Sequence, residues 1–283
     1  MSRPLPTLQT RSQPLRVATL GDNCIDVYAP PVSASAVGGN ALNVAVNLSR
    51  RGLQVEYLGA VGKDPRGLRV RRALANAHVG SSRVQIVNGR TGTSRIRLAT
   101  DGGWLLEQED LGVCGPYRPS SDDLKFLASQ DHVHCAQLHG FGHLLEELAR
   151  SGISVSYDFS TNYEVQPLEG LGIAFFSLPA AAAGAEPILR RVVRSGAQLA
   201  VGTWGSKGSV AFDGEVLSHV AAPSITAVDT VGAGDSYIAA FIHARLLGKS
   251  VRECQWAGSQ AGATTCSHLG AWVQELEPTN ETA

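Results

Sequence analysis

The sequence predicts an α/β protein in which helices cover a mostly parallel sheet. Short apolar runs alternate with helical patterns over the first eighty residues, at 15–20, 41–51, 55–61 and 67–77. This alternation is typical of parallel sheets, because a helix usually carries the chain back between two parallel strands. The alternation resumes after Pro119, without an internal repeat or a linker. We therefore expect one core domain over residues 15–273, with flexible tails at 1–14 and 274–283.

Local signals mark the expected elements. The helix at 41–51 opens after Gly38-Gly39-Asn40 and is closed by Gly52, a residue that favours helix ends. In the second half of the chain, strands are expected at 132–135, 154–158, 174–177, 199–203 and 209–212. Helices are expected at 121–129, 142–151, 186–195, 233–247 and 251–266.

A β-rich stretch at 83–114 interrupts the alternation. Arg95 to Leu98 alternates polar and apolar residues, as a strand with one solvent-exposed face does. Asp101-Gly102-Gly103 is a hairpin signal, and 104–107 would be the returning strand. Together with the segment near 27–37, residues from about 90 to 110 are expected to form a small β lid. Its exposed strand edges also predict a homodimer paired through the lid.

Composition excludes several classes of protein. The 24 Lys and Arg residues balance 25 Asp and Glu residues, so the sequence lacks the basic footprint of a nucleic-acid or anionic-membrane binder. The five cysteines form no C-x-x-C pair, which favours reduced thiols over a disulfide framework. Since there is neither an apolar leader nor a run of about 20 apolar residues, we expect a soluble cytoplasmic protein.

The stretch from Asp229 to Asp235 carries the strongest chemical signal. It reads Asp-Thr-Val-Gly-Ala-Gly-Asp and runs directly into an apolar helix. The glycines allow a tight turn, and the first N–H groups of a helix are free to bind an anion such as a transferring phosphoryl group. Asp235, at the rim of this anion hole, could accept the proton of an attacking hydroxyl. In the structural alternative, both aspartates merely cap the helix.

Three strings together resemble one enzyme family. The stretch 229–235 resembles the signature of the ribokinase-like (PfkB-type) carbohydrate kinases, and Gly38 to Ala45 and Val61 to Gly67 resemble two further motifs of that family. The resemblance spans about residues 15–273. It implies a three-layer α/β/α fold with a central mainly parallel sheet and a small β lid. It also implies ATP as phosphoryl donor and Mg2+ as counter-ion, and it leaves open a monovalent cation near the Asp229 loop.

The resemblance assigns roles by position. Asp235 would be the catalytic base, with an anion hole formed by Asp229, Thr230, Gly232, Ala233 and Gly234. The substrate hydroxyls would meet Asp26, Gly38, Gly39, Asn40 and Asn43, although Asp26 could be a turn residue and Asn43 a solvent-facing helical one. The nucleotide would contact Thr203, Gly205, Gly208 and His268, with 257–271 beside the adenine; a plain hairpin turn is the alternative at 203–208.

The sequence departs from the family pattern where the metal ligands are expected. The family usually carries an Asn, and a Glu three residues later, after the strand that ends near residue 177. Here the stretch 176–182 reads Phe-Ser-Leu-Pro-Ala-Ala-Ala, and no carboxylate follows until Glu186. The Mg2+ ligands therefore remain unassigned.

Two short strings narrow the substrate class. Gly21 to Tyr28 and His268 to Trp272 resemble the fructoselysine 6-kinases within the family. That likeness implies transfer to the C6 hydroxyl of fructoselysine or a related fructosamine, with Arg95, Arg97 or Glu107 of the lid meeting the amino-acid end. Ribose, fructose and a nucleoside stay open as alternative acceptors.

Other functions agree less well with the sequence than a kinase does. A kinase-like protein that binds a sugar or nucleotide without efficient turnover is suggested by the alanines at 180–183, but the retained Asp235 counts against it. No G-x-G-x-x-G follows the first strand, which disfavours a dinucleotide oxidoreductase. The spacing of His132, His134, His139 and His143 fits no common zinc pattern, so we expect a structural role for them.

Overall fold

The computed structural model describes residues 14–98, 104–138, 140–164, 168–178 and 185–279. Most of the expected N-terminal tail, the hairpin signal at 101–103, His139 and the alanines at 180–183 lie outside these ranges.

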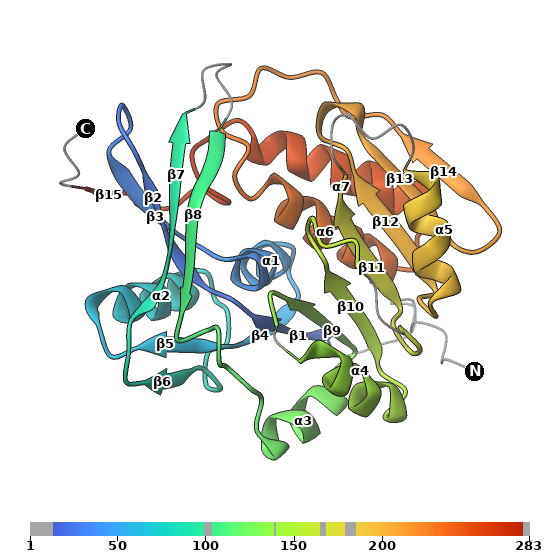
Figure 1. The fold of residues 1–283 in the computed structure, drawn as a ribbon, viewed down its shortest axis with the longest axis horizontal. Coiled ribbons are helices and arrows are strands. Elements are labelled where there is room, and N and C mark those ends of the chain that lie inside the picture. Colours follow the sequence, from blue (N-terminus) through green and yellow to red (C-terminus); the bar gives the residue numbers. More distant parts are fainter. Residues whose placement is uncertain (1–13, 99–103, 139, 165–167, 179–184, 280–283) are drawn as a thin grey trace.

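An eight-stranded sheet forms the centre of the molecule (Figure 1). Its spatial order is β14-β13-β12-β11-β10-β9-β1-β4, and the six strands from β12 to β4 are parallel. The strands are β1 (Arg16–Gly21), β4 (Gln54–Leu58), β9 (His132–Ala136), β10 (Ser154–Asp158), β11 (Ile173–Ser177), β12 (Leu199–Thr203), β13 (Ser209–Phe212) and β14 (Leu217–Val220). The short edge strand β14 was not expected from the sequence.

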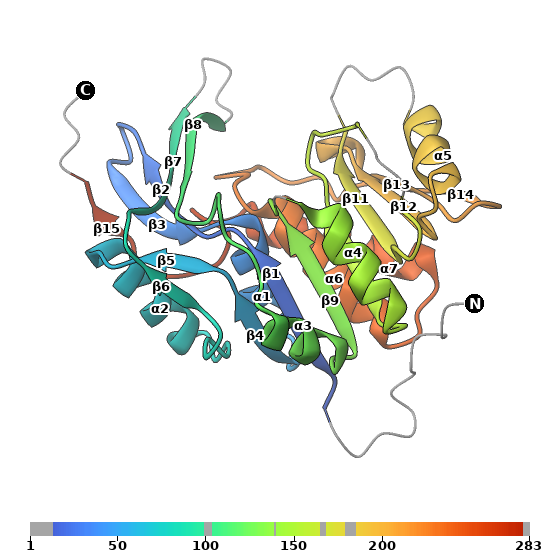
Figure 2. The same cartoon turned by 60° about the horizontal axis from the view of Figure 1, so that its bottom comes forward.

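Helices cover both faces of this sheet (Figure 2). One face packs against α1 (Asn40–Ser49), α6 (Ala233–Leu246) and α7 (Val251–Thr265). The other packs against α3 (Ser121–Ala128), α4 (Phe141–Arg150) and α5 (Glu186–Arg194). Successive residues of a strand enter opposite cores, as Val17 and Ala18 do, because side chains alternate across a sheet. The three-layer α/β/α prediction is confirmed.

A second sheet of five strands forms the lid. Its order is β15-β3-β2-β7-β8, with β2 (Cys24–Tyr28), β3 (Ala34–Gly38), β7 (Thr91–Leu98), β8 (Trp104–Gly112) and β15 (Glu277–Pro278). The lid is therefore larger than the segments 27–37 and 90–110 expected from the sequence. Figure 1 shows it beside the central sheet, with the β7–β8 hairpin projecting from the molecule.

The C-terminal segment is part of the lid, which corrects the expectation of a flexible tail for residues 274–279. Gln274 exchanges two hydrogen bonds with the backbone of Val37, and β15 pairs with β3. Arg69 adds an ion pair to Glu277 at 3.1 Å. The physical reason is that β3 would otherwise leave an unpaired edge, and these short polar contacts cover it.

The expected strand 55–61 is divided between two sheets. β4 ends at Leu58, and β5 (Ala60–Gly62) pairs instead with β6 (Gln85–Val87), which the sequence did not predict. α2 (Pro65–Asn76) connects these two strands. Gly59 lies at the division, where a Cβ atom would come within 2.2 Å of the Tyr57 hydroxyl.

The histidines at the start of β9 are buried in the sheet. His132 contacts the Ser154 and Ser156 hydroxyls at 3.0 and 2.8 Å, and His134 contacts Ser156 at 2.8 Å. Burial lowers the pKa of each ring to about 3. Both rings are therefore neutral at pH 7. Among the described residues no group of three or more His, Cys, Asp or Glu side chains could hold a metal ion. The described helices also lack the length and apolar character needed to cross a membrane.

These histidines make a testable contribution to stability. An unfolded histidine takes up a proton near pH 6.5, whereas the folded rings do so only near pH 3, so their contribution to the free energy of unfolding falls as the pH drops below 6.5. From pH 7 to pH 5 the loss should be about 2 kcal/mol per ring. Urea unfolding should therefore show the stability gap between wild type and His134→Asn narrowing by about 2 kcal/mol at pH 5.

The matched control is His78→Asn. His78 is solvent-exposed and has a φ of 55°, which asparagine also tolerates. The difference in free energy of unfolding between this variant and the wild type should be the same at pH 7 and pH 5. The same constancy in His134→Asn would contradict burial of a neutral ring.

Candidate active site

The carboxyl ends of the parallel strands bring polar side chains to one edge of the central sheet. β9 is followed by Gln137, and β10, β11 and β12 end at Asp158, Ser177 and Thr203. Open α/β sheets bind ligands at this edge, because the strand ends and the following loops leave polar groups free there. A small cavity of about 150 Å³ lies at this edge, and its lining includes Asp158, Ser177 and Thr203 together with residues of α1 and α6.

The glycine loop before α6 is held by Asp229. The buried Asp229 carboxylate accepts hydrogen bonds from the Tyr28 hydroxyl (2.6 Å), the Val231 N–H (2.9 Å) and the Gly270 N–H (2.8 Å). Its oxygens thus bond within the protein, whereas the resemblance places Asp229 in the anion hole; Thr230 beside it is exposed. Asp229 instead fixes the path of the loop that follows.

Gly232 and Gly234 have different reasons to be glycines. Gly232 adopts a φ of 73°, and a Cβ atom there would lie 2.1 Å from the Cβ of Ala271. At Gly234 an added Cβ would meet nothing within 4 Å, so its surface opens into the cavity. α6 begins after Gly232 without a side-chain cap; the Ala233 N–H donates to the Thr230 carbonyl at 3.2 Å, and the Gly234 and Asp235 N–H groups that follow are available to an anion. This arrangement fits the predicted anion hole at 232–234.

Asp235 lies in the first turn of α6 and is buried. Its carboxylate accepts a hydrogen bond of 2.6 Å from the Asn43 amide of α1. Burial raises the pKa of Asp235 well above its usual value, the nearby Asp158 raises it further, and the Asn43 bond partly offsets the shift. Neutralising charge nearby, such as a bound cation, would therefore be needed to keep Asp235 ionised.

The start of α1 is built around two glycines and a capping aspartate. Asp22 accepts hydrogen bonds from the Asn40 and Ala41 N–H groups at 2.7 and 3.0 Å. A Cβ on Gly39 would come within 2.4 Å of the Asn23 backbone, so only glycine permits this approach. Asn43 is buried here, and its Oδ1 accepts no hydrogen bond from the described residues. This oxygen could therefore accept a hydrogen bond from a ligand hydroxyl. Burial of the side chain excludes the alternative in which Asn43 faces solvent.

Asp26 belongs to the lid strand β2, and its charge is near enough to raise the pKa of Asp235. A Cβ on Gly38 would lie 2.0 Å from the Asp26 carboxylate, so this glycine makes room for the acid. Burial raises the pKa of Asp26 to about 6, and Cys24 donates to it at 3.2 Å. In the register of the lid, Asp26 pairs with Ser94, and Ser94 pairs with Glu109. Side chains of paired residues share one face of a sheet, so Glu109 belongs to the face of Asp26.

The same register corrects the assignment of Arg95 to the substrate site. Arg95 follows Ser94 directly and therefore points to the opposite face of the lid. There Arg95 and Arg97 form ion pairs with Glu107 at 3.0 and 3.3 Å. The sequence alone did not show which face of β7 looks inward. The alternation of burial, with Ser94 and Ile96 buried, shows it in the structure.

The predicted nucleotide residues lie at the end of β12, in the turn that follows it, and after α7. Thr203 lines the small cavity at the end of β12. Gly205 begins a short 3-10 helix and Gly208 ends it, where a Cβ would lie 2.0 Å from the Val220 carbonyl; close packing against β14 thus accounts for Gly208. His268 follows α7 and contacts the Leu269 carbonyl at 3.2 Å.

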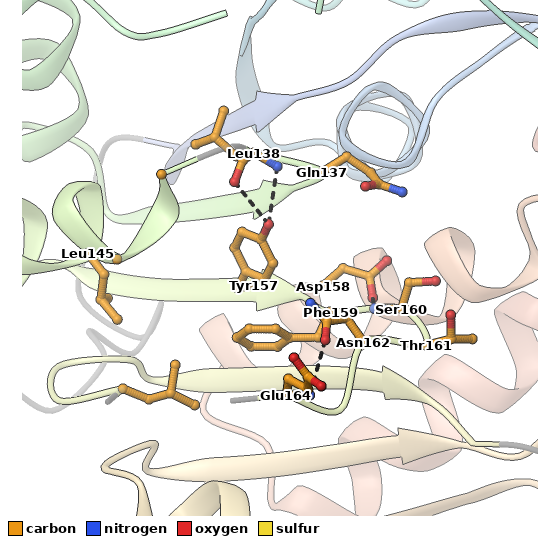
Figure 3. A pocket seen from close by; sticks show the side chains of 13 residues that line it. Gln137, Leu138, Leu145, Tyr157, Asp158, Phe159, Ser160, Thr161, Asn162 and Glu164 are labelled. Carbon is orange, nitrogen blue, oxygen red and sulfur yellow. Dashed lines mark hydrogen bonds between the residues drawn. The ribbon is translucent and has the colours of Figure 1, made fainter. Parts of the chain in front are cut away.

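Asp158 is the main residue that the sequence interpretation missed. It is partly buried, burial raises its pKa to about 6, and the Asn40 amide lies 3.5 Å from it. The position of an acid directly after a predicted strand, at 154–158, was the signal that could have found it. Asp158 and Ser160 also line a second, larger cavity of about 560 Å³ (Figure 3).

Comparison with known proteins now identifies the family. The model of the "pfkB family carbohydrate kinase" matches residues 19–138 and 171–277. The chain belongs to this family. Fructoselysine 6-kinase of Shigella flexneri is 32% identical over 261 residues, which cover 90% of this chain and 99% of the relative. A fructosamine kinase of Bacillus subtilis is 27% identical, covering 91% of this chain and 93% of the relative. The chain is thus a sugar kinase, a phosphotransferase with an alcohol group as acceptor.

The fold of the chain is also similar to that of solved structures. A ribokinase of Arabidopsis thaliana, complexed with ribose and ATP, superimposes with a TM-score of 0.77. The sequences are 23% identical, and the match covers 91% of this chain and 94% of the ribokinase. This likeness confirms the ribokinase-like architecture expected from the three sequence motifs.

The two glycines of the loop give a matched pair of variants. Gly232→Ala forces a methyl group into Ala271 at a φ of 73° and should lower the free energy of unfolding by about 1–3 kcal/mol. Gly234→Ala meets no protein atom and lies inside a helix, so stability should be unchanged or slightly higher. Its methyl group would occupy the anion hole and should lower kcat about 100-fold.

Thermal unfolding and kinase assays of the two variants check this. Equal loss of stability in both would contradict the different packing described for the two positions.

Proposed function

We propose that the protein is an ATP-dependent kinase that phosphorylates the C6 hydroxyl of fructoselysine or a related fructosamine. The observation that carries the kinase chemistry is the buried Asp235, held by Asn43 beside the uncapped start of α6. The substrate class is supported by the relatives, of which the 32% identical one is a fructoselysine 6-kinase.

Asp235 acts as the general base. Its carboxylate accepts the proton of the C6 hydroxyl as the hydroxyl oxygen attacks the γ-phosphorus of ATP. The N–H groups of Gly234 and Asp235 stabilise the negative charge on the transferring phosphoryl group. Asn43, with its free Oδ1, and Asp26 orient the sugar hydroxyls. Proton acceptance requires an ionised Asp235, and its raised pKa makes ionisation dependent on positive charge brought by the ligands.

The lining of the small cavity fits a magnesium ion. Its described carboxylates are Asp158 and Asp235, and Mg2+ prefers oxygen ligands and keeps several waters. These two acids would supply the negative surroundings for an ion held mainly by phosphate oxygens and water. Such an ion neutralises the charge of the donor phosphates.

The first experiment is an ADP-release assay with Mg-ATP. Fructoselysine should be turned over, and fructose, ribose and a nucleoside should react much more slowly. Equal turnover of a simple sugar would keep the kinase and remove the fructosamine assignment. Binding of ATP and sugar without any turnover would favour a binding protein.

Asp235→Asn should lower kcat about a thousandfold, because the amide cannot accept a proton. Calorimetry should show that the affinities for ATP and fructoselysine change only a few-fold. The matched control is Asp229→Asn, which weakens the contacts of a buried structural carboxylate and should lower the melting temperature instead. A kcat within tenfold of the wild type in Asp235→Asn would exclude it as the base.

Asn43→Ala should change the pH dependence of catalysis. The Asn43 amide stabilises the ionised form of Asp235, so its loss raises the pKa of Asp235 and moves the acid limb of kcat/KM to higher pH. At pH 7 the rate should fall about tenfold. Asn47→Ala, one turn later, removes an amide that bonds only backbone carbonyls and should leave the limb in place. An unmoved limb in Asn43→Ala would show that another group controls it.

A further inference from the structure

The larger cavity beside the reacting centre has no role in phosphoryl transfer as described above. At about 560 Å³ it is within the size range of ligand pockets and almost four times the volume of the small cavity. Asp158 and Ser160 line both cavities, so a ligand in the large one lies directly beside the acceptor site. Figure 3 shows side chains from β10, the loop that follows it and α4 around this space.

The walls carry both acidic and apolar side chains. Asp158 lines this cavity and the small one. The apolar members of the lining are Leu138, Leu145, Tyr157, Phe159 and Leu168, and the lining also includes the polar Thr161 and Asn162. The exposed Glu164 lines the cavity from the loop after β10. The described lining includes no Lys, Arg or His side chain. Such walls accept an aliphatic chain with a positive charge and repel a ligand with net negative charge.

The backbone around the cavity is held in an unusual conformation. Gln137 and Ser160 follow β9 and β10, and both have positive φ values, 47° and 50°, although neither is a glycine. Such conformations are unfavourable for residues other than glycine and persist where the surrounding structure fixes them, often at ligand sites. The Asp158 carboxylate accepts the Ser160 N–H at 2.8 Å, and the Tyr157 hydroxyl contacts the Leu138 backbone at 3.1 and 3.4 Å (Figure 3). These bonds fix the two walls in place.

We propose that this cavity binds the amino-acid arm of the substrate, with Glu164 as the partner of its α-ammonium group. The proposal rests on the function proposed above and adds the site that selects a lysine arm. The lysine side chain supplies four CH2 groups for contact with the apolar side chains of the lining. The amine that joins it to the sugar lies near Asp158, and the distal α-ammonium group reaches Glu164. The α-carboxylate is accommodated by the backbone at Gly142, in the uncapped first turn of α4.

The test uses two ligands that differ in one group. Fructoselysine carries the α-ammonium, whereas the fructosamine of 6-aminohexanoate has the same length and carboxylate but lacks it. The wild type should show a KM about fivefold lower for fructoselysine, as expected for an ion pair near the surface. In Glu164→Gln the two KM values should become equal, with kcat unchanged for both ligands. Glu164→Lys should reverse the preference.

The matched control is Glu146→Gln, which makes the same chemical change on an exposed acid of α4 paired with Arg150 at 3.8 Å. It should keep the wild-type preference. Because Glu164 is exposed, loss of folding is not expected, and melting temperatures verify this. If Glu164→Gln retains the preference for fructoselysine, the cavity does not bind the α-ammonium and the inference is overturned.

A second variant distinguishes a role of Asp158 beside the amino-acid arm from a role near the metal ion. Asp158→Asn should raise the KM of both fructosamines, and calorimetry without ATP and Mg2+ should show the same loss of fructosamine affinity. Unchanged fructosamine affinity in the absence of ATP and Mg2+ would limit Asp158 to the surroundings of the metal and overturn its role beside the arm. Failure of the wild type to bind or phosphorylate any fructosamine would instead remove the proposed function itself, together with the arm site.

Discussion

The buried carboxylate of Asp229 is the contact on which the site depends. Its three donors come from the lid strand β2, from the glycine loop and from the segment after α7. The three segments are far apart in the sequence, so this one side chain sets the position of the lid relative to the start of α6. A buried carboxylate is tolerated because each bond offsets part of the cost of removing it from water. The glycine loop can then present its N–H groups without a side chain of its own in the site.

The second constraint is the accumulation of acids around Asp235. Burial raises the pKa of Asp22, Asp26, Asp158 and Asp235, and the charges of the first three raise the pKa of Asp235 further. Carboxylates so close together disfavour one another's ionised forms. Positive charge from a metal ion or from an ammonium group offsets this effect. The site is thus suited to a base that becomes active when its ligands are in place, and to a substrate that carries an amine.

The sequence supported most of the architecture. The expected strands and helices of the core recur in the structure within a few residues, because strongly periodic or continuous apolar segments have little choice of structure between two helical layers. The errors lie at the edges. β6, β14 and β15 are short and partly polar, and their pairing with a neighbour, rather than their own pattern, makes them strands. The tail at 274–279 was misjudged for the same reason.

The sequence by itself determined the glycine turn at 229–235 and the helix that follows it, because a glycine turn that leads into an apolar helix has the same local geometry wherever it lies. It also singled out Asn43, which the structure places within hydrogen-bond distance of Asp235. Only the tertiary structure decided which face of the lid looks inward, and so put Glu109 on the face of Asp26 and Arg95 on the opposite one. It alone brought Asp158 to Asn40 and joined two cavities at that residue. Local patterns fix the backbone of a few residues, whereas the neighbours of a side chain depend on which strands pair and in which register.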